Sequence, residues 1–508
     1  MPRMLAACLF WVCATGALVA RAGDMPWVSM DPASRTTFRR EGAGPFVSVG
    51  VNYFDHQTGW APRLWQRFDE ARVRRHLAMI RGRGFNTIRL FLTYESFHRE
   101  PGRVSGDGPG KFRKLLAICR ELGLYLIASG PDHWEGTPEW RRAADRFADE
   151  NILAADEAWW AEFARMFGDE PAILAWDVYN EPAIGWDSPA LRRQWNEWLK
   201  RRYGSVDKIA AAWARKPEEI GTSGSVDVPP REPAPGDARL YDYQCFRETV
   251  ADEWTGRMTR AIRSADRRHL ITVGHVQWTV PVCLPTIWHY AAFDVKQNAR
   301  HVDFVTIHFY PLAPPRPCDS PEGIEANAVY LEALLYLCTT DKPLMIGEFG
   351  WYGGGELRVD GRVEYPDRPP SHQVEWCSEL LNITRGRCVG WLNWAFADPP
   401  EARDLSRWSG CWTESLQLKP WGDVFGRFAR RVTACPDPPR DFPAYVRSFP
   451  FDRRALLTSP EAGNHCRAEL ARLRRTSPQG KGDPGIGEPR SRSPAAVKDR
   501  PSPLRARS

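Results

Sequence analysis

Two glutamates each follow a short apolar run with the composition of a buried strand. The run ILAWDV at residues 173–178 continues into Asn180 and Glu181, and the run LMIGEFG at residues 344–350 contains Glu348. If both strands end at the same edge of one sheet, their carboxyl groups face each other there. A facing pair suits cleavage of a glycosidic bond, in which a carboxylic acid protonates the leaving oxygen and a carboxylate attacks the sugar.

Other polar or aromatic residues lie at the ends of further apolar runs. These candidate site residues are Arg89, His133, His308, Tyr310 and Trp394. His308 and Tyr310 are two positions apart, so both project from the same side of an extended strand. A single buried histidine or tryptophan is more typical of packing than of chemistry. The whole set at successive strand ends indicates a site.

Eight apolar runs alternate with helix-like patterns along the chain. They lie near residues 45–54, 85–94, 124–130, 173–178, 270–275, 302–310, 344–350 and 388–396. Strands that are apolar on both faces are typical of a parallel sheet covered by helices. Eight of them predict a closed (β/α)8 TIM barrel over residues 45–432. An open, doubly wound sheet is the alternative, but no glycine-rich phosphate loop follows the first strand.

The connection after the fourth strand is unusually long, at residues 182–236. It contains a helix pattern with Leu191, Trp195 and Leu199 on one face. Because insertions at the carboxyl ends of barrel strands face the site, this one is expected to shape the cleft. Residues 433–473 are predicted to be a weakly structured appendage.

Residues 474–508 are predicted to be a disordered basic tail, because they lack apolar periodicity and are rich in Pro, Ser, Gly and Arg. The net charge is +6, yet residues 471–508 alone contain ten Lys/Arg and three Asp/Glu. The rest of the chain is therefore close to neutral. We expect no nucleic-acid partner.

Residues 1–22 have the pattern of a signal peptide. Arg3 precedes the apolar residues 4–19, and Ala20-Arg21-Ala22 offers a small-x-small cleavage site. The mature protein is therefore predicted to be secreted or periplasmic, with an uncleaved anchor as the alternative. No other segment reaches the length of a membrane span, so no stable membrane insertion is expected after the leader is removed.

No cofactor and no metal are predicted. Ten of the twelve cysteines lie beyond the leader, and none of them shows C-x-x-C or another metal-ligand spacing. Cys377, Cys388 and Cys411 are candidates for disulfide pairing in an oxidising compartment, with free buried thiols an equal alternative.

Five motifs together resemble a known group. They are the Arg of TIRLF, the Asn-Glu-Pro after the fourth strand, the His-x-Tyr of the sixth, the Gly-Glu-Phe-Gly of the seventh and the Trp of the eighth. Over residues 45–430 the chain resembles the retaining glycoside hydrolases of clan A, most of all the cellulase and mannanase family five. The resemblance implies an oligo- or polysaccharide substrate.

The resemblance also implies a role for each site residue. Glu181 is similar to the acid/base and Glu348 to the nucleophile. Asn180 resembles the residue that holds the sugar 2-hydroxyl, and Trp394 the floor under the sugar being cleaved. The remaining substrate-binding candidates are Arg89, His133, His308 and Tyr310.

Simple electrostatics supports these roles. A retaining mechanism needs the two carboxyls about 5–5.5 Å apart. The fixed charge of Arg89 is expected to lower the pKa of Glu348, and Tyr310 to donate to the same carboxylate. The negative charge of Glu348 is expected to raise the pKa of Glu181, so that Glu181 starts protonated.

The substrate is less constrained. The motifs favour a secreted retaining β-glycosidase acting on β-mannan or β-glucan. Residues 201–214 and 240–254 resemble family forty-two β-galactosidases, so an exo-acting, β-galactosidase-like enzyme is an alternative. Two others are a non-catalytic carbohydrate-binding barrel and a metal-dependent hydrolase using His275, His308 and Glu348.

The chain has 23 tryptophans, several of them in expected loops, where they suit stacking against sugar rings or plain packing under the loops. They are Trp60, Trp134, Trp140, Trp186, Trp278, Trp351, Trp408 and Trp412.

Overall fold

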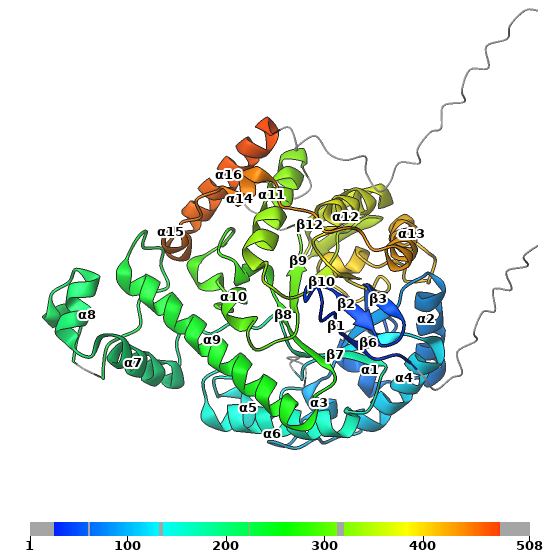
Figure 1. The fold of residues 1–508 in the computed structure, drawn as a ribbon, viewed down its shortest axis with the longest axis horizontal. Helices are drawn as coiled ribbons and strands as arrows, with labels where there is room; N and C mark the ends of the chain where they lie inside the picture. Colours follow the sequence, from blue (N-terminus) through cyan, green and yellow to red (C-terminus); the bar gives the residue numbers. More distant parts are fainter. Residues whose placement is uncertain (1–24, 59–60, 132–135, 223, 312–319, 478–508) are drawn as a thin grey trace, which may run out of the picture.

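The computed structural model describes residues 25–477 except 59–60, 132–135, 223 and 312–319. Eight parallel strands close into a barrel in the order β10-β13-β4-β5-β6-β7-β8-β9 (Figure 1). The predicted (β/α)8 barrel is confirmed. Its strands are β4 (Ser48–Asn52), β5 (Thr87–Phe91), β6 (Tyr125–Ser129), β7 (Ile173–Asn180), β8 (Leu270–His275), β9 (Val305–Phe309), β10 (Leu344–Phe349) and β13 (Gly390–Asn393).

Two irregularities in strand pairing lie immediately before the two candidate glutamates. Between Asp177 and Asn180, β7 has one residue more than its partner β8. Between Ile346 and Glu348, β10 has one residue more than β9. An extra residue in one strand turns the following side chain to a new direction, and such bulges are frequent beside active sites.

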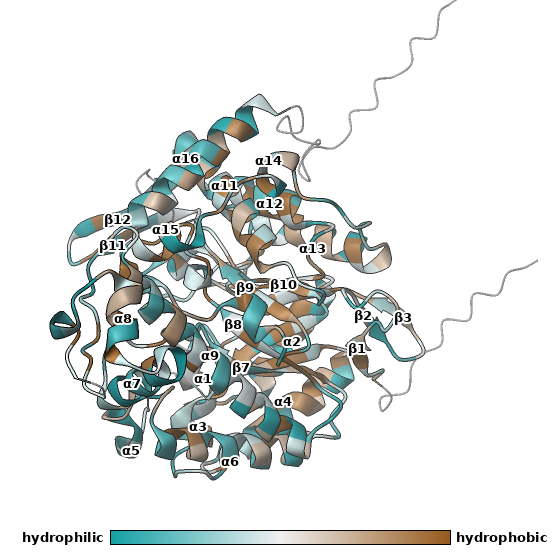
Figure 2. Ribbon diagram, turned by 60° about the vertical axis from the view of Figure 1, so that its left-hand side comes forward, coloured by the Kyte–Doolittle hydropathy of each residue, from teal (hydrophilic) through white to brown (hydrophobic). Residues whose placement is uncertain are grey.

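Helices cover the outside of the barrel. The principal ones are α2 (Glu70–Gly82), α4 (Gly108–Leu122), α6 (Glu150–Phe167), α9 (Ala238–Ala265), α11 (Pro321–Cys338), α12 (Pro370–Thr384) and α13 (Pro420–Ala434). Shorter helices are α1 (Ala61–Gln66), α3 (Tyr94–Phe97), α5 (Glu139–Arg142) and α10 (Val295–Asn298), the last between β8 and β9. Helices such as α4 carry hydrophilic and hydrophobic residues side by side, as expected when one face is buried (Figure 2).

The insertion after β7 forms a helical hairpin. It consists of α7 (Pro189–Tyr203) and α8 (Val206–Trp213), which pack against the long helix α9 at the periphery of the molecule (Figure 1). Leu191, Trp195 and Leu199 are buried, which confirms the predicted helix face. Much of the insertion therefore extends the outer helical layer.

The expected first strand is too long, because its first residues belong to a separate sheet. Strands β1 (Val28–Met30), β2 (Phe38–Arg40) and β3 (Gly44–Phe46) form a three-stranded antiparallel sheet before the barrel. Pro45 has no N–H to donate, so it suits the edge strand β3 rather than a central barrel strand.

Residues after β10 form a hairpin of β11 (Gly355–Val359) and β12 (Arg362–Arg368). Gly355 begins this hairpin, and a Cβ there would overlap the ring of Trp408. Close packing therefore accounts for this glycine.

The prediction of a weakly structured appendage is wrong. Helices α14 (Ala444–Arg447) and α16 (Pro460–Thr476) pack beside α11, and α15 (Arg453–Thr458) packs against α9 and α16 (Figure 1). Leu457 and Leu470 are fully buried, and this apolar pattern stabilises the helices against the barrel. Helix α16 also extends into the first residues of the predicted tail. The rest of that tail and the predicted signal peptide lie outside the described residues.

Among the described helices, none combines the length and apolar character needed to cross a membrane. Cys377, Cys388 and Cys411 are buried free thiols, so the structure favours the unpaired alternative for them.

Candidate active site

The carboxyl ends of the barrel strands bring most of the predicted site residues together. Arg89 is on β5, Asn180 ends β7 with Glu181 directly after it, His308 is on β9, and Glu348 is on β10. Because all eight strands are parallel, these ends share one mouth of the barrel. His133 lies outside the described residues.

Arg89 is the centre of the hydrogen-bond network beneath this mouth. Its Nη1 donates to Glu348 Oε1 at 2.6 Å, and its Nη2 donates to Asp177 Oδ2 at 2.7 Å. Further donations reach Asn52 Oδ1 at 2.9 Å and Asn180 Oδ1 at 2.8 Å. Arg89 is fully buried, so its charge is balanced by the two carboxylates instead of by water.

The two glutamates face each other across His308. His308 Nδ1 lies 3.0 Å from Glu181 Oε1 and 3.5 Å from Glu348 Oε1. A nitrogen of His308 and one carboxylate oxygen of each glutamate all lie within 4.8 Å of one another. Such closeness fits the short separation of the two carboxyl groups in retaining enzymes.

The two carboxyls differ in surroundings. Glu348 is 5% exposed, and its second oxygen accepts a hydrogen bond of 2.8 Å from the hydroxyl of Tyr310. Glu181 has a side chain that is 33% exposed at the mouth. Glu348 is thus held by donors on both oxygens, whereas Glu181 is held by His308 and remains accessible from the mouth.

Burial decides the pKa values in this site. It raises the pKa of Glu181 to about 7, with Arg89 opposing the shift. The expected cause, repulsion from Glu348, is not the main one for Glu181. Burial also raises the pKa of Glu348, although His308, Arg89 and the Tyr310 hydroxyl each lower it, so Arg89 acts in the predicted direction without determining the net shift.

His308 is neutral at pH 7, because burial lowers its pKa to about 4. Its other side faces Gly274, where a Cβ would lie 3.1 Å from His308 Nε2 and 3.0 Å from Arg89 Nη2. Only glycine leaves room there for both side chains. Arg89 and His308, which were predicted to bind substrate, are both fully buried beside the carboxyls.

Glu181 has a strained backbone. Its φ is +51°, in the left-handed region that non-glycine residues rarely adopt. Its N–H donates to the carbonyl of Gly274 at 2.8 Å, which holds this conformation in place. Backbone strain of this kind concentrates at functional sites, where the surrounding structure enforces it.

Trp394 lies beside this group, after β13. Its indole N–H donates to Ser406 Oγ at 2.8 Å, and its ring packs 5.7 Å from Phe54 and 5.8 Å from Phe91. The tryptophan is 6% exposed and is rigidly supported. It has the surroundings of the expected aromatic floor.

Some of the loop tryptophans are buried, and others are partly exposed. Trp186, Trp351 and Trp412 are buried, so plain packing accounts for them. Trp140, Trp278 and Trp408 are partly exposed, and Trp60 and Trp134 lie outside the described residues. The most exposed tryptophan of the described chain is Trp288, at 46%, which the sequence analysis missed.

Several polar residues of the site escaped prediction. Asn52 and Ser129 accept from Arg89, and the side-chain oxygen of Gln277 accepts from the backbone N–H of Tyr310 at 2.8 Å. Asp177 is fully buried in β7 and also accepts from the N–H of Gly274. A carboxylate inside the apolar run ILAWDV was the available indication, because such a buried charge needs a partner.

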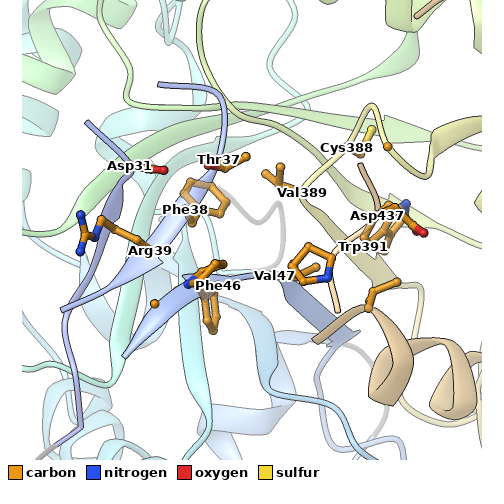
Figure 3. A pocket seen from close by; sticks show the side chains of 15 residues that line it. Asp31, Thr37, Phe38, Arg39, Phe46, Val47, Cys388, Val389, Trp391 and Asp437 are labelled. Atoms are coloured by element: carbon orange, nitrogen blue, oxygen red, sulfur yellow. The ribbon is translucent and has the colours of Figure 1, made fainter. Parts of the chain in front are cut away.

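A cavity of about 330 Å³ lies at the opposite end of the barrel. It is lined by residues that precede β4 and β13, with Phe38 and Phe46 of the small sheet and Trp391 on its walls (Figure 3). None of the predicted site residues lines it. This cavity is therefore separate from the paired glutamates.

A closed (β/α)8 barrel with two glutamates paired at its mouth is the arrangement of the clan A retaining glycoside hydrolases. The chain belongs to glycosyl hydrolase family 5, because the model of that family, named Cellulase, matches residues 48–398. This confirms the resemblance to clan A and its family five.

Known proteins provide more distant likenesses. Cellodextrinase A of Ruminococcus flavefaciens is 26% identical over 36% of this chain and 53% of its own length. Beta-galactosidase YesZ of Bacillus subtilis is 22% identical over 44% of this chain and 37% of its own length. The chain thus spans about half the length of the first relative and less of the second.

Among solved structures, a GH5_18 protein of Streptomyces cattleya in complex with Manβ1-4GlcNAc has a TM-score of 0.57 at 17% identity. The alignment covers 84% of this chain and 91% of that one. At this identity the likeness concerns the fold.

Replacing Arg89 tests the buried network. Arg89→Ala is expected to lower the free energy of unfolding by about 3–5 kcal/mol, because Asp177 and Glu348 remain buried without their partner. Urea unfolding followed by circular dichroism measures the change. The matched control is Arg103→Ala, whose pair with Glu100 is exposed and is expected to matter by less than about 1 kcal/mol. Equal losses in the two variants would contradict the central role of Arg89.

Proposed function

We propose that this protein is a retaining β-glycosidase that cleaves O-glycosidic bonds by double displacement. The observation that carries the proposal is the pair Glu181 and Glu348, whose oxygens lie within 4.8 Å and share His308. Glu348 is the nucleophile that attacks the anomeric carbon. Glu181 is the acid that protonates the leaving oxygen and then the base that activates water.

The hydrogen bonds support this division of roles. Both oxygens of Glu348 accept donors, from Arg89 and Tyr310, which favours the ionised form required of a nucleophile. Burial raises the pKa of Glu181 to about 7, which favours the protonated form required of an acid. Protonation of the leaving oxygen leaves Glu181 ionised. Once the sugar is bonded to Glu348, the negative charge of that carboxylate is lost, so Glu181 can stay ionised and take a proton from the attacking water.

The residues around the pair position it or hold the sugar. Arg89 and His308 are positioning residues, because both are buried and contact the carboxyls. Asn180 is fixed by Arg89 beside Glu181, and we assign its amide to the sugar 2-hydroxyl. Trp394 forms the floor beneath the ring, and His133 completes the substrate-binding set.

For the substrate we propose β-linked mannosyl or glucosyl oligosaccharides. The support is the family match, the cellodextrinase relative and the fold shared with a protein bound to Manβ1-4GlcNAc. A β-galactoside is the second candidate, supported by the similarity to the β-galactosidase YesZ.

Hydrolysis of aryl-β-glycosides tests the activity. The protein is expected to release the aryl group from the mannoside or glucoside, with the sugar first appearing in its original anomeric configuration by NMR. Glu348→Gln should lower kcat by about 10⁴-fold or more, as loss of a nucleophile does elsewhere. The exposed Glu364→Gln is the matched control and should keep full activity.

Three results would overturn parts of the proposal. Inverted product would exclude double displacement, and a preference for the galactoside would favour the second candidate. Sugar binding without turnover on any aryl glycoside would favour a non-catalytic carbohydrate-binding barrel. Screening mannan, cellulose and short oligosaccharides with product sizing then separates endo- from exo-cleavage.

The pH dependence tests the role of Glu181. Above about pH 7 the acid loses its proton, so kcat/KM on substrates with a poor leaving group should fall as pH rises through that value. A dinitrophenyl glycoside needs no protonation of its leaving group, so this alkaline fall should be absent there. Steady-state rates from pH 5 to 9 measure both, and an identical fall for both substrates would assign it to another group.

We also propose that the protein acts outside the cytoplasm, because residues 1–22 have the pattern of a cleaved leader. Expression of the full chain in a bacterial host, followed by fractionation and N-terminal sequencing, tests this. The expected result is a periplasmic or secreted product that begins near Gly23. A cytoplasmic product that keeps Met1 would contradict it.

A further inference from the structure

A second cluster of ionisable side chains lies between the loop after β4 and helix α2. It consists of Asp55 and His56, which follow the strand, and His76 on the helix. Each is at most 1% exposed. One carboxylate oxygen of Asp55 and one ring nitrogen of each histidine all lie within 4.8 Å of one another. The proposed activity uses none of these residues.

Each histidine of this cluster has one unsatisfied ring nitrogen. The Nε2 of His56 lies 3.0 Å from the carbonyl oxygen of Glu414. Because a carbonyl only accepts, Nε2 carries the proton and Nδ1 carries a lone pair. His56 Nδ1 and His76 Nε2 are both buried and have no hydrogen-bond partner in the structure. A buried polar atom without a partner is costly, so two of them facing one carboxylate need an explanation.

The other ring nitrogen of each histidine has a partner of the kind found in metal-binding histidines. Ligating imidazoles usually donate their second N–H to a backbone carbonyl or another oxygen, which fixes the ring and its tautomer. His56 does so to Glu414, and the Nδ1 of His76 lies 3.2 Å from the hydroxyl of Tyr53.

The charge balance allows a cation. Asp55 is the carboxylate of the cluster, and the neighbouring cation is Arg72, which donates to Asp55 and lies 3.4 Å from Asp69. Arg72 is 21% exposed and the side chain of Asp69 is 46% exposed, so the arginine retains a second acidic partner at the surface. Asp55 accepts one hydrogen bond on each oxygen, from Arg72 and from the N–H of Gln57. A carboxylate has about four lone-pair sites, so one remains for a metal bond.

We propose that Asp55, His56 and His76 bind a first-row divalent transition-metal ion, with Zn²⁺ the best match. Two imidazole nitrogens and one carboxylate oxygen are ligands that Zn²⁺ prefers, and a water completes a tetrahedral set. The ion has a structural role and joins the loop after β4 to α2. This proposal departs from the prediction of no metal, and it stands independently of the proposed glycosidase activity.

The position of the cluster links such an ion to the barrel mouth. The rings of His56 and His76 lie 6.0 and 5.0 Å from Phe396, two residues after Trp394. Phe54 precedes Asp55 and packs 5.7 Å from the same Trp394. An ion at the cluster would therefore stiffen both segments that support Trp394.

Metal content and thermal stability test the site in the full chain. Protein stripped with EDTA and dialysed against Zn²⁺ is expected to retain about one ion per chain by atomic emission, and to melt at a higher temperature in Zn²⁺ than in EDTA or Mg²⁺. Co²⁺ in its place should give the visible absorption of a tetrahedral site. His56→Gln and His76→Gln should lose the ion and the Zn²⁺-dependent part of the melting temperature.

Two further variants make the result specific. Glu348→Gln alters the other group with metal-ligand spacing, Glu181–His308–Glu348, and should leave zinc retention unchanged. His98→Gln removes a buried histidine that also has unpartnered nitrogens but no second histidine beside it, and should likewise keep the ion.

Two outcomes would contradict the proposed zinc site. Wild-type protein that retains no Zn²⁺ and melts identically in Zn²⁺, Mg²⁺ and EDTA would overturn the site and leave a bridging water as the partner of the two nitrogens. Zinc lost in Glu348→Gln would place the ion at the paired glutamates instead. If a histidine variant fails to fold, Asp55→Asn gives the same comparison, with its circular dichroism in EDTA as the check on folding.

Discussion

The buried charge of Arg89 is the constraint on which the site depends. A guanidinium without access to water must be surrounded by acceptors, and the barrel supplies them from β4, β6 and β7 and from Glu348 on β10. The same bonds fix Asn180 and Glu348 relative to each other. One arginine therefore determines both the stability of the barrel interior and the geometry of the chemistry above it.

The site also depends on departures from regular structure. The extra residues in β7 and β10 and the left-handed backbone of Glu181 turn the two glutamates toward His308. Gly274 leaves the space in which His308 and Arg89 approach each other. A regular parallel barrel would direct these side chains alternately inward and outward, so the irregularities convert a stable scaffold into a convergent group.

The sequence was sufficient for the barrel and for its paired glutamates, because buried parallel strands and polar strand ends both leave local patterns. It was insufficient where the outcome depends on contacts between distant segments. The helix with Leu457 packs on α9 and the helix with Leu470 on α11, and their short apolar pattern was too weak to predict alone. Asp177 lies inside an apolar run and was therefore not recognised as a site residue. The main cause of the raised pKa of Glu181 is burial, which depends on the packing of the folded protein and not on the local sequence.

The two histidine–carboxylate clusters contain the same residue types but differ in the burial of the neighbouring arginine. At the barrel mouth, Arg89 is fully buried and bonded to Glu348, so its guanidinium supplies the positive charge of that cluster. Behind β4, the cation is Arg72, which lies near the surface and has Asp69 as a second partner. Two imidazoles lie beside Asp55 there, and each has one unsatisfied ring nitrogen. The first cluster is thus organised to hold and move a proton, whereas the second is organised to accept a positive ion from solution.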